Sequence, residues 1–166
     1  MSLTDATVWP EYIINFASSA KVSNHYFALY NKLLFNLFRP PDFVFGHEKS
    51  DINTIYFIVY TKDYRPVLIV NVQNDVSLQG RIKGDQQMRQ RYDALLTECP
   101  LSHMWGMSFV GTALRIYCGD VTTGSVVPPS EDNLEQAWNI DLLSPEGFAE
   151  VKQVAKLVQD SARLLY

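Results

Sequence analysis

Three amide side chains lie on two neighbouring apolar runs at a spacing that could bring them together at one site. Asn71 and Gln73 lie two positions apart in one run, so they share one face of a strand. Asn53 begins the preceding run and could converge on them. Such a place would suit a metal ion, but Mg²⁺ prefers anionic oxygen and neutral amides bind it poorly. The three residues therefore have the shape of a metal site without its charge, or they are ordinary polar residues near strand ends.

A pair of polar residues on the following helix could add to this site. Gln87 and Arg91 lie four positions apart, on one face of a helix expected over 85–98. They could bind a phosphate or line a cleft above the amides. The alternative is that they belong to a solvated helix face.

The amides depend on two strands for their position. The runs 55–61 and 67–72 are rich in β-branched and aromatic residues, and this composition predicts two strands. The segment 62–66, which ends in a proline, is short enough to be the turn of an antiparallel hairpin. We expect the hairpin to lie at the centre of a sheet, with the helix over 85–98 packed on it.

Periodicity and breaker residues predict the remaining elements. A short helix opens at Trp9-Pro10-Glu11, and the segment 21–24 interrupts it. The other expected elements are a helix through 26–38 ended by prolines, a short strand over 43–47, a polar loop over 47–51, a loop over 74–80, strands over 104–110 and 113–117, a mobile loop over 118–133 and a last helix from Ser144. The order α-α-β-β-β-α-β-β-α predicts a mixed α/β (α+β) fold, with a central mixed sheet flanked by helices.

Several motifs in this order carry a family resemblance. They are His25-Tyr26-Phe27 with Leu29-Tyr30-Asn31-Lys32-Leu33-Leu34, the stretch from Asn53 through Pro66 to Leu68-Ile69-Val70-Asn71-Val72-Gln73, the pair Gln87 and Arg91, Met104-Trp105-Gly106-Met107-Ser108 with Gly111, Arg115 and Tyr117, and Trp138-Asn139-Ile140-Asp141. Over roughly 23–160 the chain resembles a large family of basidiomycete fungal proteins that carry a restriction-endonuclease-like domain of the PD-(D/E)XK superfamily. The resemblance implies such a core over 23–160, with 1–22 as an N-terminal helical extension of a single domain, 1–166.

The resemblance also implies what has been lost. Nucleases of this type hold Mg²⁺ with an Asp and a Glu on adjacent strands, and a Lys two residues after the Glu offsets charge in the transition state. The matching positions here are Asn53, Asn71 and Gln73. We therefore expect a pseudoenzyme with no catalytic residue, no metal and no cofactor. Its expected role is that of a binding module.

Two alternatives stay open at this point. A carboxylate that has migrated could restore a metal site and an active nuclease, and the nearby acidic or metal-binding residues are His47, Glu48, Asp51, Asp63 and Asp75. The domain could instead bind nucleic acid without cleaving it.

Composition narrows the class of partner. The net charge is −4, which disfavours non-specific nucleic-acid binding, so we expect a protein partner, a second copy of the chain included. No apolar run approaches the ~20 residues of a membrane span, and no signal peptide is visible, so we expect no membrane contact and an intracellular location. Cys99 and Cys118 lack metal-ligand spacing and are expected to be free thiols.

Overall fold

The computed structural model describes residues 8–20 and 23–166. The first seven residues of the expected N-terminal extension lie outside the described residues, as do positions 21 and 22 of the break expected over 21–24, and α2 already begins at Ser23. The helices are α1 (Glu11–Ser19), α2 (Ser23–Leu37), α3 (Leu78–Leu95), the 3₁₀ turn η1 (Leu96–Glu98) and α4 (Pro145–Arg163). The strands are β1 (Phe43–Asp51), β2 (Thr54–Thr61), β3 (Pro66–Gln73), β4 (His103–Val110), β5 (Ala113–Asp120), β6 (Val126–Val127) and β7 (Ile140–Asp141).

The seven strands form one mixed sheet, which confirms the mixed α and β architecture. Its order is β1-β2-β3-β4-β5-β6, and β7 also pairs with β5. Among the strands of the described residues, β3 and β4 are the pair that runs parallel, because α3 makes the connection between them, and the other pairs are antiparallel. The expected β2–β3 hairpin at the centre of the sheet is confirmed.

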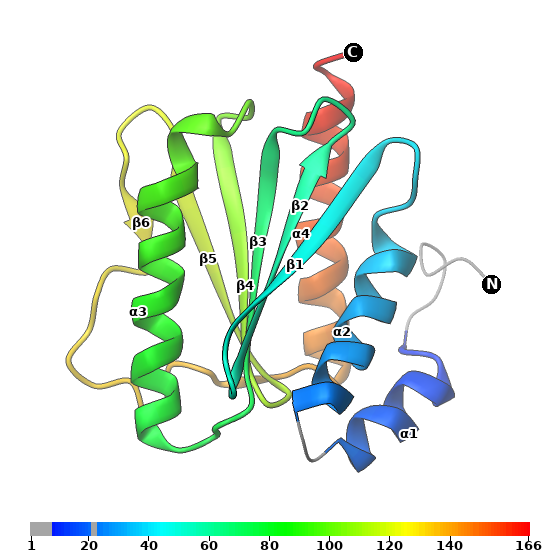
Figure 1. Cartoon of the computed structure of the whole chain (residues 1–166), viewed down its shortest axis with the longest axis vertical. Helices are drawn as coiled ribbons and strands as arrows, with labels where there is room; N and C mark the ends of the chain where they lie inside the picture. Colours follow the sequence, from blue (N-terminus) through cyan, green and yellow to red (C-terminus); the bar gives the residue numbers. More distant parts are fainter. Residues whose placement is uncertain (1–7, 21–22) are drawn as a thin grey trace.

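Helices cover the two faces of the sheet unequally (Figure 1). Helix α3 lies alone on one face, over β3 and β4, and the other three helices lie on the opposite face. Alternation along β3 directs Leu68, Val70 and Val72 toward the three-helix face, where they are fully buried or nearly so. Asn71 and Gln73 point the other way, toward α3. The α3 side therefore holds buried polar residues beside apolar ones such as Ile69, Met88 and Tyr92, which belong to the same hydrophobic core.

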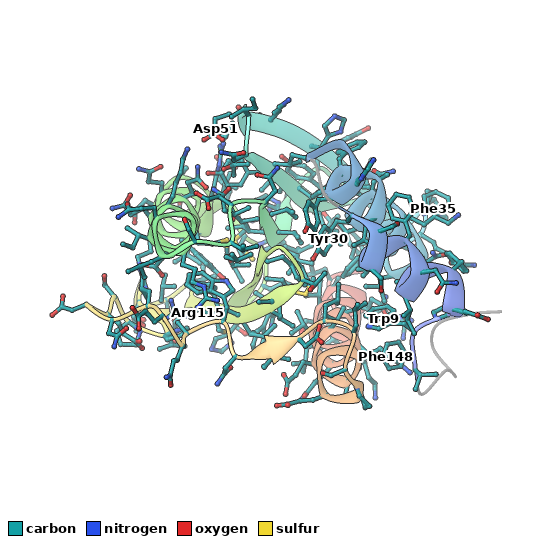
Figure 2. All side chains as sticks on the ribbon, turned by 90° about the horizontal axis from the view of Figure 1, so that it is seen from below. Trp9, Tyr30, Phe35, Asp51, Arg115 and Phe148 are labelled. Carbon is teal, nitrogen blue, oxygen red and sulfur yellow. The ribbon has the colours of Figure 1, made fainter. Side chains whose placement is uncertain are left out.

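The segment before α1 packs onto the last helix. The indole nitrogen of Trp9 donates a hydrogen bond to the carbonyl of Leu142 at 2.6 Å, and its ring meets the Phe148 ring edge-on at 4.5 Å between centroids. Figure 2 shows Trp9 and Phe148 close together at the start of α4. These contacts anchor the N-terminal helix to the far end of the chain.

The structure corrects the predicted polar loop over 47–51, which is the second half of β1. The strand lies at the edge of the sheet and pairs only with β2, so most of its polar side chains remain in water. Charged side chains are common on edge strands because they discourage pairing with other chains. The polar composition therefore marked an edge strand rather than a loop.

The structure also moves two other boundaries. Helix α3 begins at Leu78 rather than Asp85, because the Ser77 hydroxyl caps it by accepting a hydrogen bond from the Gly80 amide. Two glycines in the first turns weaken the helical signal there. The expected loop over 118–133 is shorter than predicted, since β5 continues to Asp120 and β6 lies within the segment.

Candidate functional site

Four buried side chains form a hydrogen-bonded group between the sheet and α3, which we call the amide layer: Thr54 of β2, Asn71 and Gln73 of β3, and Gln87 of α3. The Thr54 hydroxyl accepts from Gln73 Nε2 at 2.9 Å and from Gln87 Nε2 at 3.3 Å. Asn71 Nδ2 donates to Gln87 Oε1 at 3.4 Å. Helix and two strands are thus joined by neutral hydrogen bonds.

The amide layer is closed to water. Thr54, Asn71 and Gln73 are 0% exposed, and Gln87 is 7% exposed. Burial of polar groups is costly unless they are hydrogen-bonded, and most of these groups are. Among the described residues, Asn71 Oδ1 is a buried oxygen without a hydrogen-bond partner. A ligand approaching from solvent would have to displace α3 to reach the layer.

Asn53 does not join this layer. It lies in the turn between β1 and β2, where its backbone amide binds Asp51 Oδ1 at 2.8 Å and its carbonyl accepts from the Asn74 amide at 2.9 Å. The residue opposite Gln73 in the sheet register is Thr54. The structure therefore brings Asn71, Gln73 and Gln87 together, with Thr54 in the place expected for Asn53.

Two ion pairs bridge α3 to the exposed strand β1 beside the amide layer. Lys83 Nζ lies 2.5 Å from Asp51 Oδ2, and Arg91 Nη2 lies 3.4 Å from Glu48 Oε2. The Arg91 guanidinium also stacks over the Tyr56 ring, 4.0 Å from its centroid. Arg91 therefore contacts groups of the protein itself, and ligand binding by Gln87 and Arg91 stays a prediction of the sequence.

The contacts of Lys83 and Arg91 affect the pKa values of two residues beside the amide layer, Asp51 and Tyr56. Burial alone would raise the pKa of the Asp51 carboxyl, but hydrogen bonds from Lys83 and from the Asn53 amide outweigh it and hold that pKa below its usual value. Burial raises the pKa of the Tyr56 hydroxyl in spite of the neighbouring Arg91. Both groups therefore keep their ordinary charge at neutral pH.

A second buried group, which we call the aspartate cluster, lies further along the same face: Asp85, Arg89, Arg115 and Tyr117. Asp85 accepts from Arg115 Nη1 at 3.0 Å, from the Tyr117 hydroxyl at 2.7 Å and from Arg89 Nε at 3.0 Å. Burial first, and then the hydrogen bond to Asp85, raise the pKa of the Tyr117 hydroxyl far above its usual value. Figure 2 shows Arg115 on the α3 side of the sheet and Tyr30 on the other. The cluster joins α3 to β5.

The sequence carried a partial signal for the groups that the site prediction missed. Arg115 and Tyr117 alternate with Leu114 and Ile116, so alternation predicts that both side chains face the same side of a strand. Ser108 lies opposite Asn71 in the β3–β4 register and accepts a hydrogen bond from the Trp138 indole at 3.2 Å. Neither pairing across the sheet nor contact with a distant loop can be read from spacing alone.

The residues proposed as substitute metal ligands are dispersed. Asp51 and Glu48 are paired with cations of α3, and Asp75 accepts from the Ser77 amide at 3.0 Å. Asp63 lies at the opposite end of β2, where it accepts from the Tyr166 hydroxyl at 2.6 Å, and the His47 ring packs on Phe27. Within residues 8–20 and 23–166 no three His, Cys, Asp or Glu side chains are grouped so that they could hold a metal. Both cysteines are free thiols, Cys99 buried and Cys118 partly buried, as predicted.

Comparison with known proteins leaves the site to be judged on its geometry. No protein-family model, no curated protein and no solved structure matches the chain. In the described part of the chain, no helix combines the length and the apolar character needed to cross a bilayer.

Proposed function

We propose that this chain is a catalytically inactive restriction-endonuclease-like domain that works as a binding module for a protein. The observation that carries the proposal is the amide layer. Asn71 and Gln73, the positions where the resemblance implies a metal-binding Glu and a Lys, are neutral, buried and hydrogen-bonded to Thr54 and Gln87. The family membership is part of the proposal and rests on the motifs of the sequence.

The chemistry of phosphate hydrolysis explains why this layer argues against catalysis. Cleavage needs a metal to polarise the phosphate and to generate hydroxide, and it needs positive charge where negative charge develops. Amide oxygens hold Mg²⁺ weakly. A buried layer with no cation of its own can supply neither function.

The two alternatives find less support in the geometry. A migrated metal site would need carboxylates that converge, but Asp51 and Glu48 point to separate cations of α3 and Asp63 lies at the other end of β2. Nucleic-acid binding would need open cations on α3, but Lys83 and Arg91 are ion-paired within the protein.

Exposed aromatic side chains favour a protein partner. Tyr12 of α1 is 53% exposed and Phe35 of α2 is 49% exposed. The Tyr12 hydroxyl accepts a hydrogen bond from Asn36 Nδ2 at 3.4 Å, so α1 and α2 lie side by side, and each carries an exposed aromatic side chain. Aromatic residues are enriched in protein interfaces. An intracellular location remains a prediction of the sequence.

A cleavage assay tests the inactive-domain proposal. Purified protein is incubated with double-stranded DNA, single-stranded DNA and RNA in the presence of Mg²⁺ or Mn²⁺, and we expect no cleavage. Asp51→Ala removes the carboxylate that lies opposite Thr54 in the β1–β2 register, and Asp63→Ala is the matched control at the other end of β2. Cleavage by the native chain that is lost in Asp51→Ala and kept in Asp63→Ala would overturn the proposal in favour of a migrated metal site.

Sedimentation velocity over a range of concentrations tests the version in which the partner is a second copy. We expect a rising mass that Tyr12→Ser and Phe35→Ser reduce. Tyr64→Ser, which changes a still more exposed tyrosine in the β2–β3 turn, should leave the mass unchanged. A monomer at every concentration would remove this version.

A further inference from the structure

A pocket at the opposite end of β2 from the amide layer has a different character. It has a volume of about 440 Å³ and lies where α2 and α4 end beside the start of β1, at the top of Figure 1. Thr54 belongs to the amide layer and Thr61 lines the pocket, so the two sites are separated by seven residues of strand, roughly 23 Å. Pockets of this volume accommodate small organic molecules.

Three cationic side chains line the pocket: Arg39 after α2, Lys62 after β2 and Arg163 at the end of α4. One carboxylate, that of Asp42, lines it as well. The local balance is therefore positive in a chain whose net charge is −4. Three cations supplied by three separate segments surround a single space, and this arrangement attracts an anion.

The surroundings leave these cations accessible. All three are exposed, and Arg163 forms only an exposed contact with Asp160 at 3.5 Å. Lys62 Nζ lies over the Tyr166 ring, 3.9 Å from its centroid. These cations differ from Lys83 and Arg91 on α3, which are held by carboxylates of β1. Exposed cations of this kind can turn toward an entering ligand.

The buried part of the pocket lining includes two apolar side chains beside Thr61. Phe43 is 8% exposed and Ala162 is 5% exposed, so both present a small carbon surface to the pocket. Gln159 also lines the pocket, and its Nε2 donates to the Leu37 carbonyl at 2.6 Å, which joins the end of α2 to α4. Exposed cations beside the carbon surfaces of Phe43 and Ala162 suit an anion attached to an apolar body.

We propose that this pocket binds an organic phosphate, with its dianionic group between Arg39, Lys62 and Arg163 and its apolar body on Phe43 and Ala162. A phosphate monoester carries close to two negative charges at neutral pH and has three strong acceptor oxygens, which match three cationic donors. The proposal uses no residue of the amide layer, so it stands or fails independently of the inactive-domain proposal.

Titration of the full chain, followed by amide chemical shifts in nuclear magnetic resonance, tests this site. The probes are phenyl phosphate, inorganic phosphate, benzoate and phenol, each added separately. Phenyl phosphate should shift the amides of Thr61, Lys62 and Gln159 in a saturable way. Its Kd should be at least about 10-fold lower than those of the other three probes, because only it carries both a dianion and an apolar body.

Charge-neutral variants locate the binding. Arg39→Gln and Lys62→Gln should each raise the Kd for phenyl phosphate by about 5- to 10-fold, because each removes one charge-assisted contact at a solvated rim. Lys49→Gln makes the same change of charge at the far end of β1 and should change the Kd by less than about 2-fold. Thermal unfolding of each variant shows whether the fold is intact.

The results that would overturn the proposal are distinct. They are the absence of saturable shifts up to about 10 mM phenyl phosphate, shifts centred on other residues, an equal affinity for benzoate, or an equal loss of affinity in Lys49→Gln. Equal binding of inorganic phosphate would show a simple anion site and would remove the apolar part of the assignment.

Discussion

A charge introduced into the amide layer should destabilise the fold strongly and in a pH-dependent way. Asn71→Glu and Asn71→Gln add the same length to the side chain, so they differ only in the acidic group. Asn71 is 0% exposed, and its side chain donates a hydrogen bond to the neutral amide of Gln87. Burial of this kind disfavours the charged form of a carboxyl and raises its pKa.

The size of the effect follows from this burial. A glutamate in an unfolded chain titrates near pH ~4.3, and the unfolded state loses its proton above that value. If the folded protein keeps the proton through neutral pH, the cost grows by ~1.4 kcal/mol per pH unit and reaches about 4 kcal/mol at pH 7. Because the pKa of the carboxyl is higher in the folded chain than in the unfolded chain, the loss of stability is absent below the unfolded-state pKa and increases as the pH rises above it.

Urea unfolding of both variants, at pH values of about 4 and 7, measures this difference. Each Asn71→Glu value is compared with Asn71→Gln at the same pH, which removes the pH dependence of the rest of the protein. We expect similar stability at the acidic pH and a deficit of about 4 kcal/mol in Asn71→Glu at pH 7. A deficit below about 1 kcal/mol at pH 7 would refute the closed layer, because it would mean that water reaches the side chain.

Three further predictions concern the same side of the fold and its core. Asp85→Asn should lower the free energy of unfolding by about 3–5 kcal/mol in urea, because Arg115 stays buried without its main partner; a loss below about 1 kcal/mol would show that Glu131 compensates. Burial raises the pKa values of Tyr30, Tyr92 and Tyr117, so their contribution to stability is present below about pH 10 and is lost as the pH rises further. The ultraviolet absorbance of phenolate should show these three residues ionising only as the chain unfolds, and their ionisation within the folded chain would contradict this prediction. Gly84→Ala should stabilise the protein by about 0.5–1 kcal/mol, because alanine favours a helix and the nearest atom to the added carbon, Trp138 Cζ2, is 3.7 Å away. Gly80→Ala, the matched control in the same helix, should destabilise the protein by about 2–3 kcal/mol through a clash with the Asp75 carbonyl, and equal effects of the two variants in thermal unfolding would disprove the packing of α3.

The β2–β3 hairpin could be predicted from sequence because its information is local. Both strands are apolar and rich in β-branched residues, and a short turn joins them. The shared face of Asn71 and Gln73 followed from alternation alone. The apolar stripe of α4 could also be predicted from sequence, and its residues Phe148, Val151 and Val158 are buried.

The register and the long-range pairs could not be predicted in the same way. Whether Asn53 or Thr54 lies opposite Gln73 is a shift of one residue in register, and such a shift reverses the face of every side chain in a strand. That register depends on the backbone contact between Asn53 and Asn74, which no local pattern reports. The contact between Asp85 and Arg115 joins residues thirty positions apart. Its existence depends on how α3 lies across the sheet.

The measurement that tests the central claim most directly is a titration of the native chain with Mn²⁺, followed by paramagnetic broadening of backbone amide signals. The claim is that the amide layer lacks the anionic oxygens that hold a divalent metal. We expect weak broadening near exposed carboxylates and none that is selective for Thr54, Asn71 and Gln73. Selective broadening of these three signals at micromolar Mn²⁺ would contradict the claim and would restore the active-nuclease alternative.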